Sequence, residues 1–431
     1  MFINPSKLSK ILKYVNGLSL IFLFLLIRIP NITIFSPNIS LLYSNNLARL
    51  LCICMVILNL LIGKLNEKVV YIVPFVVYLF TQTVSVTHAQ NIQSFLTTYK
   101  DVVFGLFFYL AGLALNQKRE KITAVIIYVT FINIAIQLIL YSNTLLADVI
   151  KNIMNPRYAG FFDYQIQRGR FFGDGLDEAF IPILIYVLFK QDKKTLFLKI
   201  ISLLTLVGIT YITFISSWRT KLIIYIFALV LGFIFSLPLI KKLKYVVFSL
   251  IAGLIAILML FSMNLIPSQN NILTRIFQED IENAEIHETR LTLLDNAWRM
   301  GISSPLYGVG LGNYYDNLSQ VSKNRNKSSD TYQQHRFVLI DDPHNILFST
   351  FASSGLVGVV GLLLLFGSLL KKDYLHFYRS REDVFKNLMI VSFWAFFIYS
   401  LFNPWIYFAY LSNLWFLRGL IDGNTPNENT T

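Results

Sequence analysis

Apolar runs long enough to cross a lipid bilayer recur along nearly the whole chain, separated by short polar stretches. About 20 apolar residues in a helix span the hydrocarbon core, so each run predicts a transmembrane helix. The sequence therefore predicts an all-α polytopic membrane protein with about twelve transmembrane helices. The predicted spans are 15–35, 47–63, 69–87, 101–116, 122–142, 176–190, 197–215, 221–240, 245–266, 344–370, 386–403 and 404–421.

Composition agrees with this fold class. Of the 431 residues, 55% are hydrophobic and only 14% are charged, whereas about a quarter are charged in a typical soluble domain. The net charge of +13 would suit a nucleic-acid partner, but the cations gather on one predicted side of the membrane and therefore indicate topology. We expect no nucleic acid. Cys52 and Cys54 share one predicted helix and point in different directions, so we expect no disulfide or metal framework.

Lysines and arginines determine the predicted sidedness. They gather in connections that lie on the side of the N-terminus, whereas the short connections on the other side are nearly free of lysine. Because cationic connections stay in the cytoplasm, we expect both termini to be cytoplasmic. No small-residue cleavage site follows the first run, so we interpret it as an uncleaved span. The cationic connections are 64–68, 118–121, 190–199, 241–244 and 371–386.

This topology predicts four parts of the chain. One outer segment is by far the longest connection. Because connections of this length are usually functional, we expect it to carry function. The parts are transmembrane helices at 1–266, the large outer segment at 267–343, transmembrane helices at 344–421 and a disordered tail at 422–431.

Local patterns predict the structure of the outer segment and of the helix after it. Leu291, Leu294 and Trp298 recur at helical spacing and predict a helix that lies on the membrane surface or against the bundle. The glycines of SPLYGVGLGN, at 304–313, follow no strand, so we expect turns there and not a dinucleotide site. A close helix contact is predicted by four small residues, Ala352, Gly355, Gly358 and Gly361.

His344 stands in DDPHN, at the start of the tenth predicted span. One interpretation is a helix cap, because Asp342 suits the cap and Pro343 the first turn. The other is a functional site, because the run to residue 370 would be about 40 Å long, against about 30 Å of hydrocarbon. Its first turns would then stand at the depth of lipid phosphates. We favour a general base, with Asp341 and Asp342 unassigned between orienting it and capping the helix.

Cations on the outer side depart from the positive-inside pattern and are therefore further candidates. Arg219, in SSWRTKL, either snorkels to the interface or holds a phosphate by a bidentate contact. Arg290 either opens the outer helix as a phosphate ligand or is a solvated charge, and Arg170 is a third candidate. His287 is the one rival histidine that we retain, because it shares a helical face with Arg290.

The remaining polar groups favour simpler interpretations. His88 and His335 are expected to be solvated, and His376 falls on the cytoplasmic side. The acidic run at 278–288 could bind a divalent ion, but a solvated face is the simpler interpretation. The first outer loop has no acidic residue, although many metal-dependent membrane glycosyltransferases place acidic ligands there. We expect no metal and no other cofactor.

Three motifs occur in order on one predicted side of the membrane. They are SSWRTKL at 216–222, ETRLTLLDNAWRMGISSPLYGVGLGN at 288–313 and DDPHNILFSTFASSGLVG at 341–358. With these motifs the chain resembles the bacterial O-antigen ligase and O-antigen polymerase superfamily across nearly its full length. The stretch RFFGDGLDEAF, at 170–180, also resembles the arginine–glycine loop before that family's sixth span.

The resemblance implies a metal-independent, inverting glycosyltransferase of the bacterial inner membrane with a periplasmic active site. Its partners would be a glycan donor linked to undecaprenyl pyrophosphate, an acceptor hydroxyl and the bilayer. It implies that His344 is the general base and that Arg219 and Arg290 bind the pyrophosphate, with Arg170 as a further candidate. Two departures stand out: Trp218 separates the serines from Arg219, and Ser354 occupies a position that is often acidic. The second departure leaves the orientation of His344 open.

Polymerase and ligase differ in the acceptor, which is a second carrier-linked repeat or the lipid A core (or a protein). Arg290 and Gly301 enclose ten residues, a spacing found in some polymerase loops, so we favour polymerase and keep ligase as the alternative. A flippase or transporter for the same lipid-linked glycan is a more distant alternative. It predicts charges along a path at mid-membrane depth, whereas the polar exceptions here gather at the outer face.

Overall fold

The computed structural model describes only part of the chain. In this part the secondary structure is helical and contains no β-sheet, as the sequence predicts. The ninth predicted span, at 245–266, and residues 424–431 lie outside the described residues. The described residues are 5–28, 43–62, 65, 72–115, 117–142, 148–149, 176–190, 196–215, 219–236, 284–321, 343–380, 382–403 and 408–423.

The described helices follow most of the predicted spans, with different ends. The first half of the chain contributes α1 (Pro5–Arg28), α2 (Ser44–Leu61), α3 (Val73–Val84), η3 (Ser85–His88), α4 (Ile92–Ala114), α5 (Arg119–Ser142), η4 (Asp177–Phe180) and α8 (Ile181–Phe189). The second half contributes α9 (Leu196–Ile215), α10 (Arg219–Ser236), α14 (Ala284–Ser303), α15 (Tyr314–Val321), α17 (Ile346–Arg379), α18 (Val384–Ser400) and α19 (Phe408–Gly423).

Five of the described helices are long and apolar enough to cross a membrane, namely α2, α4, α5, α9 and α17. Three shorter apolar helices accompany them, at Tyr14–Arg28, Thr220–Ser236 and Val384–Ser400. The chain is therefore a helical membrane protein, while the count of twelve spans and the extent of the outer segment stay predictions.

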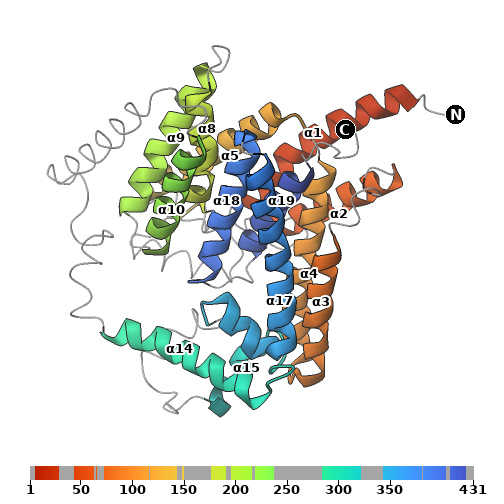
Figure 1. Cartoon of the computed structure of the whole chain (residues 1–431), viewed down its shortest axis with the longest axis vertical. Helices are drawn as coiled ribbons and strands as arrows, with labels where there is room; N and C mark the ends of the chain where they lie inside the picture. The colour runs from red at the N-terminus through yellow and green to blue at the C-terminus, as the bar shows by residue number, and fades with distance from the viewer. Residues whose placement is uncertain are drawn as a thin grey trace.

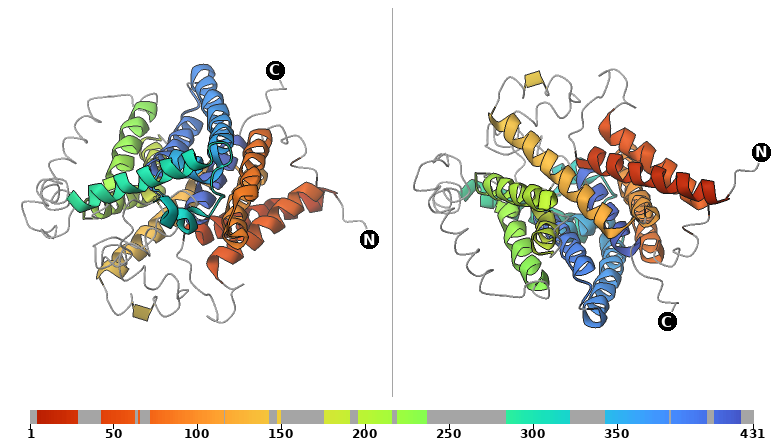
Figure 2. Two further views of the ribbon diagram at one scale, coloured as in Figure 1. Left: turned by 90° about the horizontal axis from the view of Figure 1, so that it is seen from below. Right: turned by 90° about the horizontal axis from the view of Figure 1, so that it is seen from above.

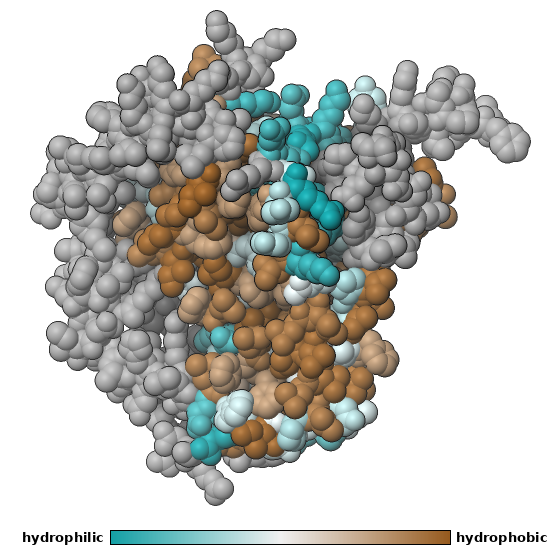
Figure 3. Space-filling model, in the orientation of Figure 1, coloured by the Kyte–Doolittle hydropathy of each residue, from teal (hydrophilic) through white to brown (hydrophobic). Residues whose placement is uncertain are grey.

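The apolar helices form one bundle, and α14 and α15 lie across one end of it (Figure 1). We call this the α14 end; it is the lower end in Figure 1, and the view from below shows α14 crossing the bundle (Figure 2). The main helix pairs are α17 with α3, α19 with α4, and α10 with α8 and α18. Figure 3 shows a broad apolar surface over α3, α4 and α17, with hydrophilic side chains gathered toward the opposite end.

The apolar surface is made of large side chains that soluble proteins would bury. Val76 and Phe80 of α3 and Leu356, Val360 and Leu363 of α17 are all exposed. A contiguous exposed apolar face of this kind is suited to lipid, because hydrocarbon tails solvate it where water does not.

Candidate functional site

The structure interrupts α17 at Gly355, where the sequence predicts a continuous span. The backbone of Gly355 has φ +61° and ψ −159°, a region that glycine alone adopts readily. Residues 346–354 therefore form a short helix set at an angle to the long remainder of α17 (Figure 1). The prediction of one straight helix from 344 to 370 is wrong, because this break redirects its first turns.

Residues 304–313, which we call the glycine loop, supply the hydrogen bonds that the break removes. On one side of the break, the amides of Leu356 and Val357 donate to Pro305 O (2.8 Å) and Leu306 O (3.2 Å). On the other side, Ala352 O and Ser353 O accept from the amides of Val309 (2.9 Å) and Gly310 (3.0 Å). A buried backbone group without a partner is costly, so these four bonds hold the broken conformation.

Glycine is required where the loop meets the break. Gly308 has φ +69°, and a Cβ atom on it would lie 2.4 Å from Ser353 C. The expected turns are therefore present, and they also allow backbone to touch backbone. On the far side of the loop, the Asn313 side chain accepts from the Asn91 amide (2.6 Å) and donates to Asn91 O (3.1 Å). The loop is thus clamped between α17 and the start of α4.

The small-residue pattern in α17 serves two purposes. A Cβ atom on Gly361 would lie 2.0 Å from Thr81 Oγ1, so this glycine allows the close contact with α3 that the sequence predicts. Gly355, in contrast, is the helix break. Ser354, at the position that is often acidic in the family, donates a hydrogen bond to Gln82 Oε1 (2.7 Å). This bond also ties the break to α3.

His344 lies two residues before α17, next to the true helix cap. The Asn345 side-chain oxygen accepts from the amides of Leu347 (2.9 Å) and Phe348 (3.1 Å), and its amide group donates to Leu401 O (3.0 Å). The interpretation of Asp342 as the cap and Pro343 as a first-turn residue is therefore wrong, because the helix begins at Ile346.

The backbone of His344 is itself unusual, with φ +57° and a half-buried side chain. Residues other than glycine and asparagine rarely adopt this backbone conformation. It costs of order 1–3 kcal/mol and is concentrated at functional sites. The strain favours a functional interpretation of His344 over a purely capping one.

A helix, α14, spans the stretch in the outer segment for which the sequence predicts one. It packs against the bundle through the short first piece of α17. Its buried face contains Leu293, Ala297 and Met300, whereas Trp298 is 50% exposed and only edges onto Phe351, with ring centroids 5.3 Å apart. Trp298 therefore lies beside the buried face of α14 and not within it.

The structure describes the backbones of the three main site candidates, and two of them, Arg290 and His344, lie on elements at the α14 end. Arg219 is the first residue of α10, and Arg290 lies within α14, which packs on the helix that His344 precedes. The side chains of Arg219, Arg290 and His287 lie outside those that the structure describes. Four other predicted residues lie outside the described residues altogether, namely Arg170, His335, Asp341 and Asp342.

A buried charged cluster at the start of α10 was not predicted from the sequence. Arg28 forms an ion pair with Asp177, whose other oxygen accepts from Asn133 Nδ2 and Gln137 Nε2 (2.8 Å each). We call Arg28, Asp177, Glu178 and Lys221 the α10 cluster; all four are buried. In its second pair, Lys221 Nζ lies 3.8 Å from Glu178 Oε1.

Contacts through α18 link this cluster to Asn345, the residue after His344. Phe180, two residues after Glu178, packs edge-on against Phe396 of α18, with ring centroids 5.4 Å apart. The C-terminal end of the same helix is held by Asn345 through Leu401 O. The start of α10 and the start of α17 are therefore anchored to the same part of α18.

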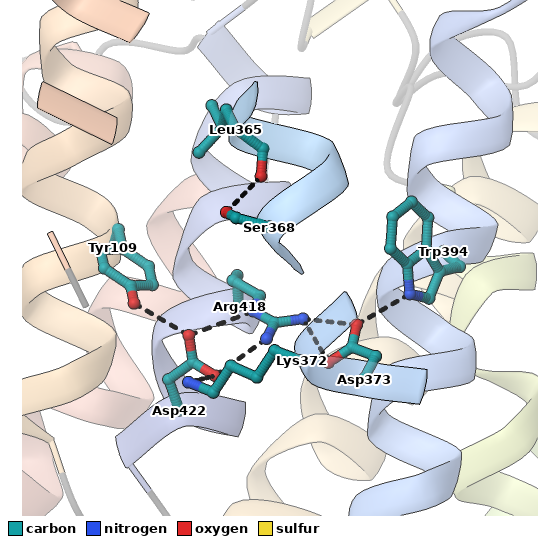
Figure 4. A network of polar contacts seen from close by, with 8 residues as sticks. All are labelled: Tyr109, Leu365, Ser368, Lys372, Asp373, Trp394, Arg418 and Asp422. Atoms are coloured by element: carbon teal, nitrogen blue, oxygen red, sulfur yellow. Dashed lines mark hydrogen bonds and ion pairs between the residues drawn. The ribbon is translucent and has the colours of Figure 1, made fainter. Parts of the chain in front are cut away.

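One sequence signal could have identified the α10 cluster. Each member is an ionisable residue at the edge of an apolar run, and such residues are costly in a membrane unless paired. The polar exceptions also do not gather in one place only, since Arg418, Asp373 and Asp422 form a second buried charged network (Figure 4). Among the described residues, no three His, Cys, Asp or Glu side chains gather as ligands of one metal ion.

Replacing Asp177 by asparagine is expected to destabilise the protein strongly, because it leaves the Arg28 charge buried without its partner. Breaking a buried ion pair in this way costs about 3–5 kcal/mol. Thermal unfolding of the detergent-purified protein measures the effect. Asp295→Asn is the control, because it breaks an exposed pair with Arg299 (2.8 Å) and should cost about 0.5 kcal/mol or less. Equal melting temperatures for the two variants would contradict the expectation.

The lipid-facing bundle, with its broken helix and the helices that pack across one end, defines a polytopic helical membrane protein. Residues 202–363 match the family model described as O-antigen ligase. This range runs from α9 into α17 and contains all three motifs. The match confirms the resemblance of this part of the chain to the O-antigen ligase and O-antigen polymerase superfamily. The matched family implies glycosyltransferase-type activity. No curated protein matches the chain.

Proposed function

We propose that this protein moves a glycan from undecaprenyl pyrophosphate to an acceptor hydroxyl at the periplasmic face of the bacterial inner membrane. The observation that carries the proposal is the family match over the three motifs. It is supported by the glycine loop, which joins the second motif to the third through four backbone hydrogen bonds. The glycine loop holds both sides of the helix break in place beside a strained histidine. Such rigid support is suited to a site that needs fixed geometry.

The roles of the residues follow from the chemistry of an inverting transfer. The acceptor oxygen attacks the anomeric carbon from the side opposite the pyrophosphate, and the bond to the pyrophosphate oxygen breaks. His344 takes the acceptor proton late in this step, a contribution of roughly 10²–10⁴-fold. Arg219 and Arg290, with Arg170 as a further candidate, neutralise the leaving pyrophosphate. Because pyrophosphate paired with guanidinium groups is already a good leaving group, the reaction needs no metal.

Between the two acceptors we favour a second carrier-linked repeat, and hence a polymerase. The spacing of Arg290 and Gly301 supports this choice, and Gly301 has a packing role, because a Cβ atom there would lie 2.2 Å from the Phe351 ring. The description of the matched family favours the alternative, a ligase that transfers to lipid A core. Transport is less well supported, since buried cations such as Arg28 and Arg418 pair with carboxylates in the described bundle.

Reconstitution of the purified protein in liposomes with carrier-linked repeat tests the proposal. We expect a ladder of lengthened glycans in the absence of lipid A core. Transfer that occurs only when core is added would establish a ligase instead. Movement of the intact carrier-linked repeat between leaflets, with no new glycosidic bond in either condition, would establish a flippase and overturn the proposal.

A further inference from the structure

A network of buried charges ties four helices together (Figure 4), near the end of α17 that lies away from α14 (Figure 1). Arg418 of α19 is fully buried and donates to both oxygens of Asp373 (2.9 and 2.7 Å) and to Asp422 (3.0 Å). Asp422 also accepts from Lys372 Nζ and from the Tyr109 hydroxyl (2.8 Å each). Both carboxylates are therefore already engaged by cations.

A third carboxylate at this end, Asp383, is engaged as well. Both terminal nitrogens of Arg119 donate to it in a bidentate pair (2.8 and 2.6 Å). Asp383 also caps α18 by accepting from the Lys386 backbone amide (3.2 Å). The nearby Glu382 is exposed to solvent.

Lys386 is the fourth cation of this end and has no carboxylate of its own. It lies in the first turn of α18 and is only 6% exposed. Its ammonium makes no hydrogen bond or ion pair with any described residue, and the charges acting on it are those of Lys372, Asp422, Asp383 and Arg418. A cation with a largely buried side chain and no counter-ion is unfavourable, and the positive end of the helix dipole adds to this cost.

His376 adds a second unsatisfied group beside this lysine. Its Nε2 atom is buried and has no hydrogen-bond partner among the described residues. The charges acting on the ring include Lys386, Asp383, Asp373 and Arg119, which places it among the same groups. Two nitrogen donors thus share a buried, positively charged environment in which every nearby buried carboxylate is already paired.

We propose that Lys386 and His376 bind an anionic phosphate group at this end of the bundle. A phosphate oxygen accepts hydrogen bonds from an ammonium and an imidazole, and its negative charge balances the fourth cation. Positive-inside topology predicts that this end faces the cytoplasm, so the phosphate comes from a lipid headgroup of the inner leaflet or from free phosphate. The inference is independent of the proposed function at the α14 end.

Lipid binding to the full-length protein in a neutral detergent tests the proposal. Native mass spectrometry counts retained phosphatidylglycerol or phosphatidylcholine, and a thermal-shift series compares inorganic phosphate with chloride at matched ionic strength. We expect wild-type protein to retain phosphatidylglycerol preferentially, or to be stabilised by phosphate. Lys386→Met should weaken binding of whichever ligand acts on the wild type by about tenfold or more, because it removes one charge-assisted hydrogen bond. Lys371→Met, which removes an exposed lysine from α17, should leave it unchanged.

The two measurements distinguish a lipid headgroup from free phosphate, and both of them from the absence of a phosphate site. A preference for phosphatidylglycerol without a phosphate shift identifies a lipid headgroup, and the reverse identifies free phosphate. Equal behaviour of Lys386→Met and wild type in both arms would overturn the proposal, as would a wild type that responds to neither ligand. If Lys386→Met cannot be purified, His376→Gln carries the same comparison and should also weaken binding.

Discussion

Replacing His344 by asparagine is expected to abolish measurable glycan transfer while leaving the protein folded in the membrane. Asparagine tolerates the positive φ of this position, so the variant removes the imidazole and keeps the backbone conformation. If His344 is the general base, the rate should fall about 10²–10⁴-fold. Transfer from carrier-linked repeat in liposomes measures the rate, and thermal unfolding measures the stability.

Two further variants separate the effect of losing the imidazole base from the effect of straining the backbone. His344→Ala should lose the same activity and be about 1–2 kcal/mol less stable than His344→Asn, because alanine is strained at this φ and asparagine tolerates it. His335→Ala removes a histidine from the predicted outer segment and should transfer at the wild-type rate. Full turnover by His344→Asn would rule out the base assignment whatever the alanine variant does.

Replacing Gly355 by alanine is expected to destabilise the protein by more than about 3 kcal/mol and to inactivate it. The backbone conformation alone costs a residue with a side chain about 1–3 kcal/mol. The added Cβ atom would also lie 2.4 Å from Leu306 C and O, so the glycine loop must move away from the break. Displacing the loop would break its four backbone hydrogen bonds to α17. The short helix that follows His344 would then lose its support.

Gly367→Ala is the matched control for this prediction. It makes the same substitution in the same helix, at a position where a new Cβ atom meets nothing within 4 Å. Alanine stabilises an interior helical position by about 1 kcal/mol relative to glycine, so this variant should unfold at the same or a higher temperature and remain active. Wild-type stability and transfer in Gly355→Ala would show that the break is dispensable.

The sequence by itself determined the features that each segment expresses locally. Runs of apolar residues identify lipid-facing and buried helices because a membrane helix must satisfy its backbone internally and expose hydrocarbon. The family also followed from local motifs, and the matched range 202–363 contains all three of them. The helix in the outer segment and the turns at its glycines followed from periodicity and from the conformational freedom of glycine.

The tertiary structure decided which of several locally acceptable states the chain adopts. Asp342 and Asn345 are both good cap residues, and Asn345 caps α17 in the structure, where its side chain also reaches Leu401 O. The break at Gly355 could not be predicted from 344–370 alone, because the groups that satisfy it belong to the distant glycine loop.

Long-range charge pairing could not be predicted from the sequence for the same reason. Arg28 and Asp177 are 149 residues apart, and each alone would be a costly charge in an apolar segment. Which cation meets which carboxylate depends on which helices are neighbours, and that is a property of the packed bundle. Local composition determines that a helix forms and faces lipid, whereas compensation of buried polar groups is decided only where distant helices meet.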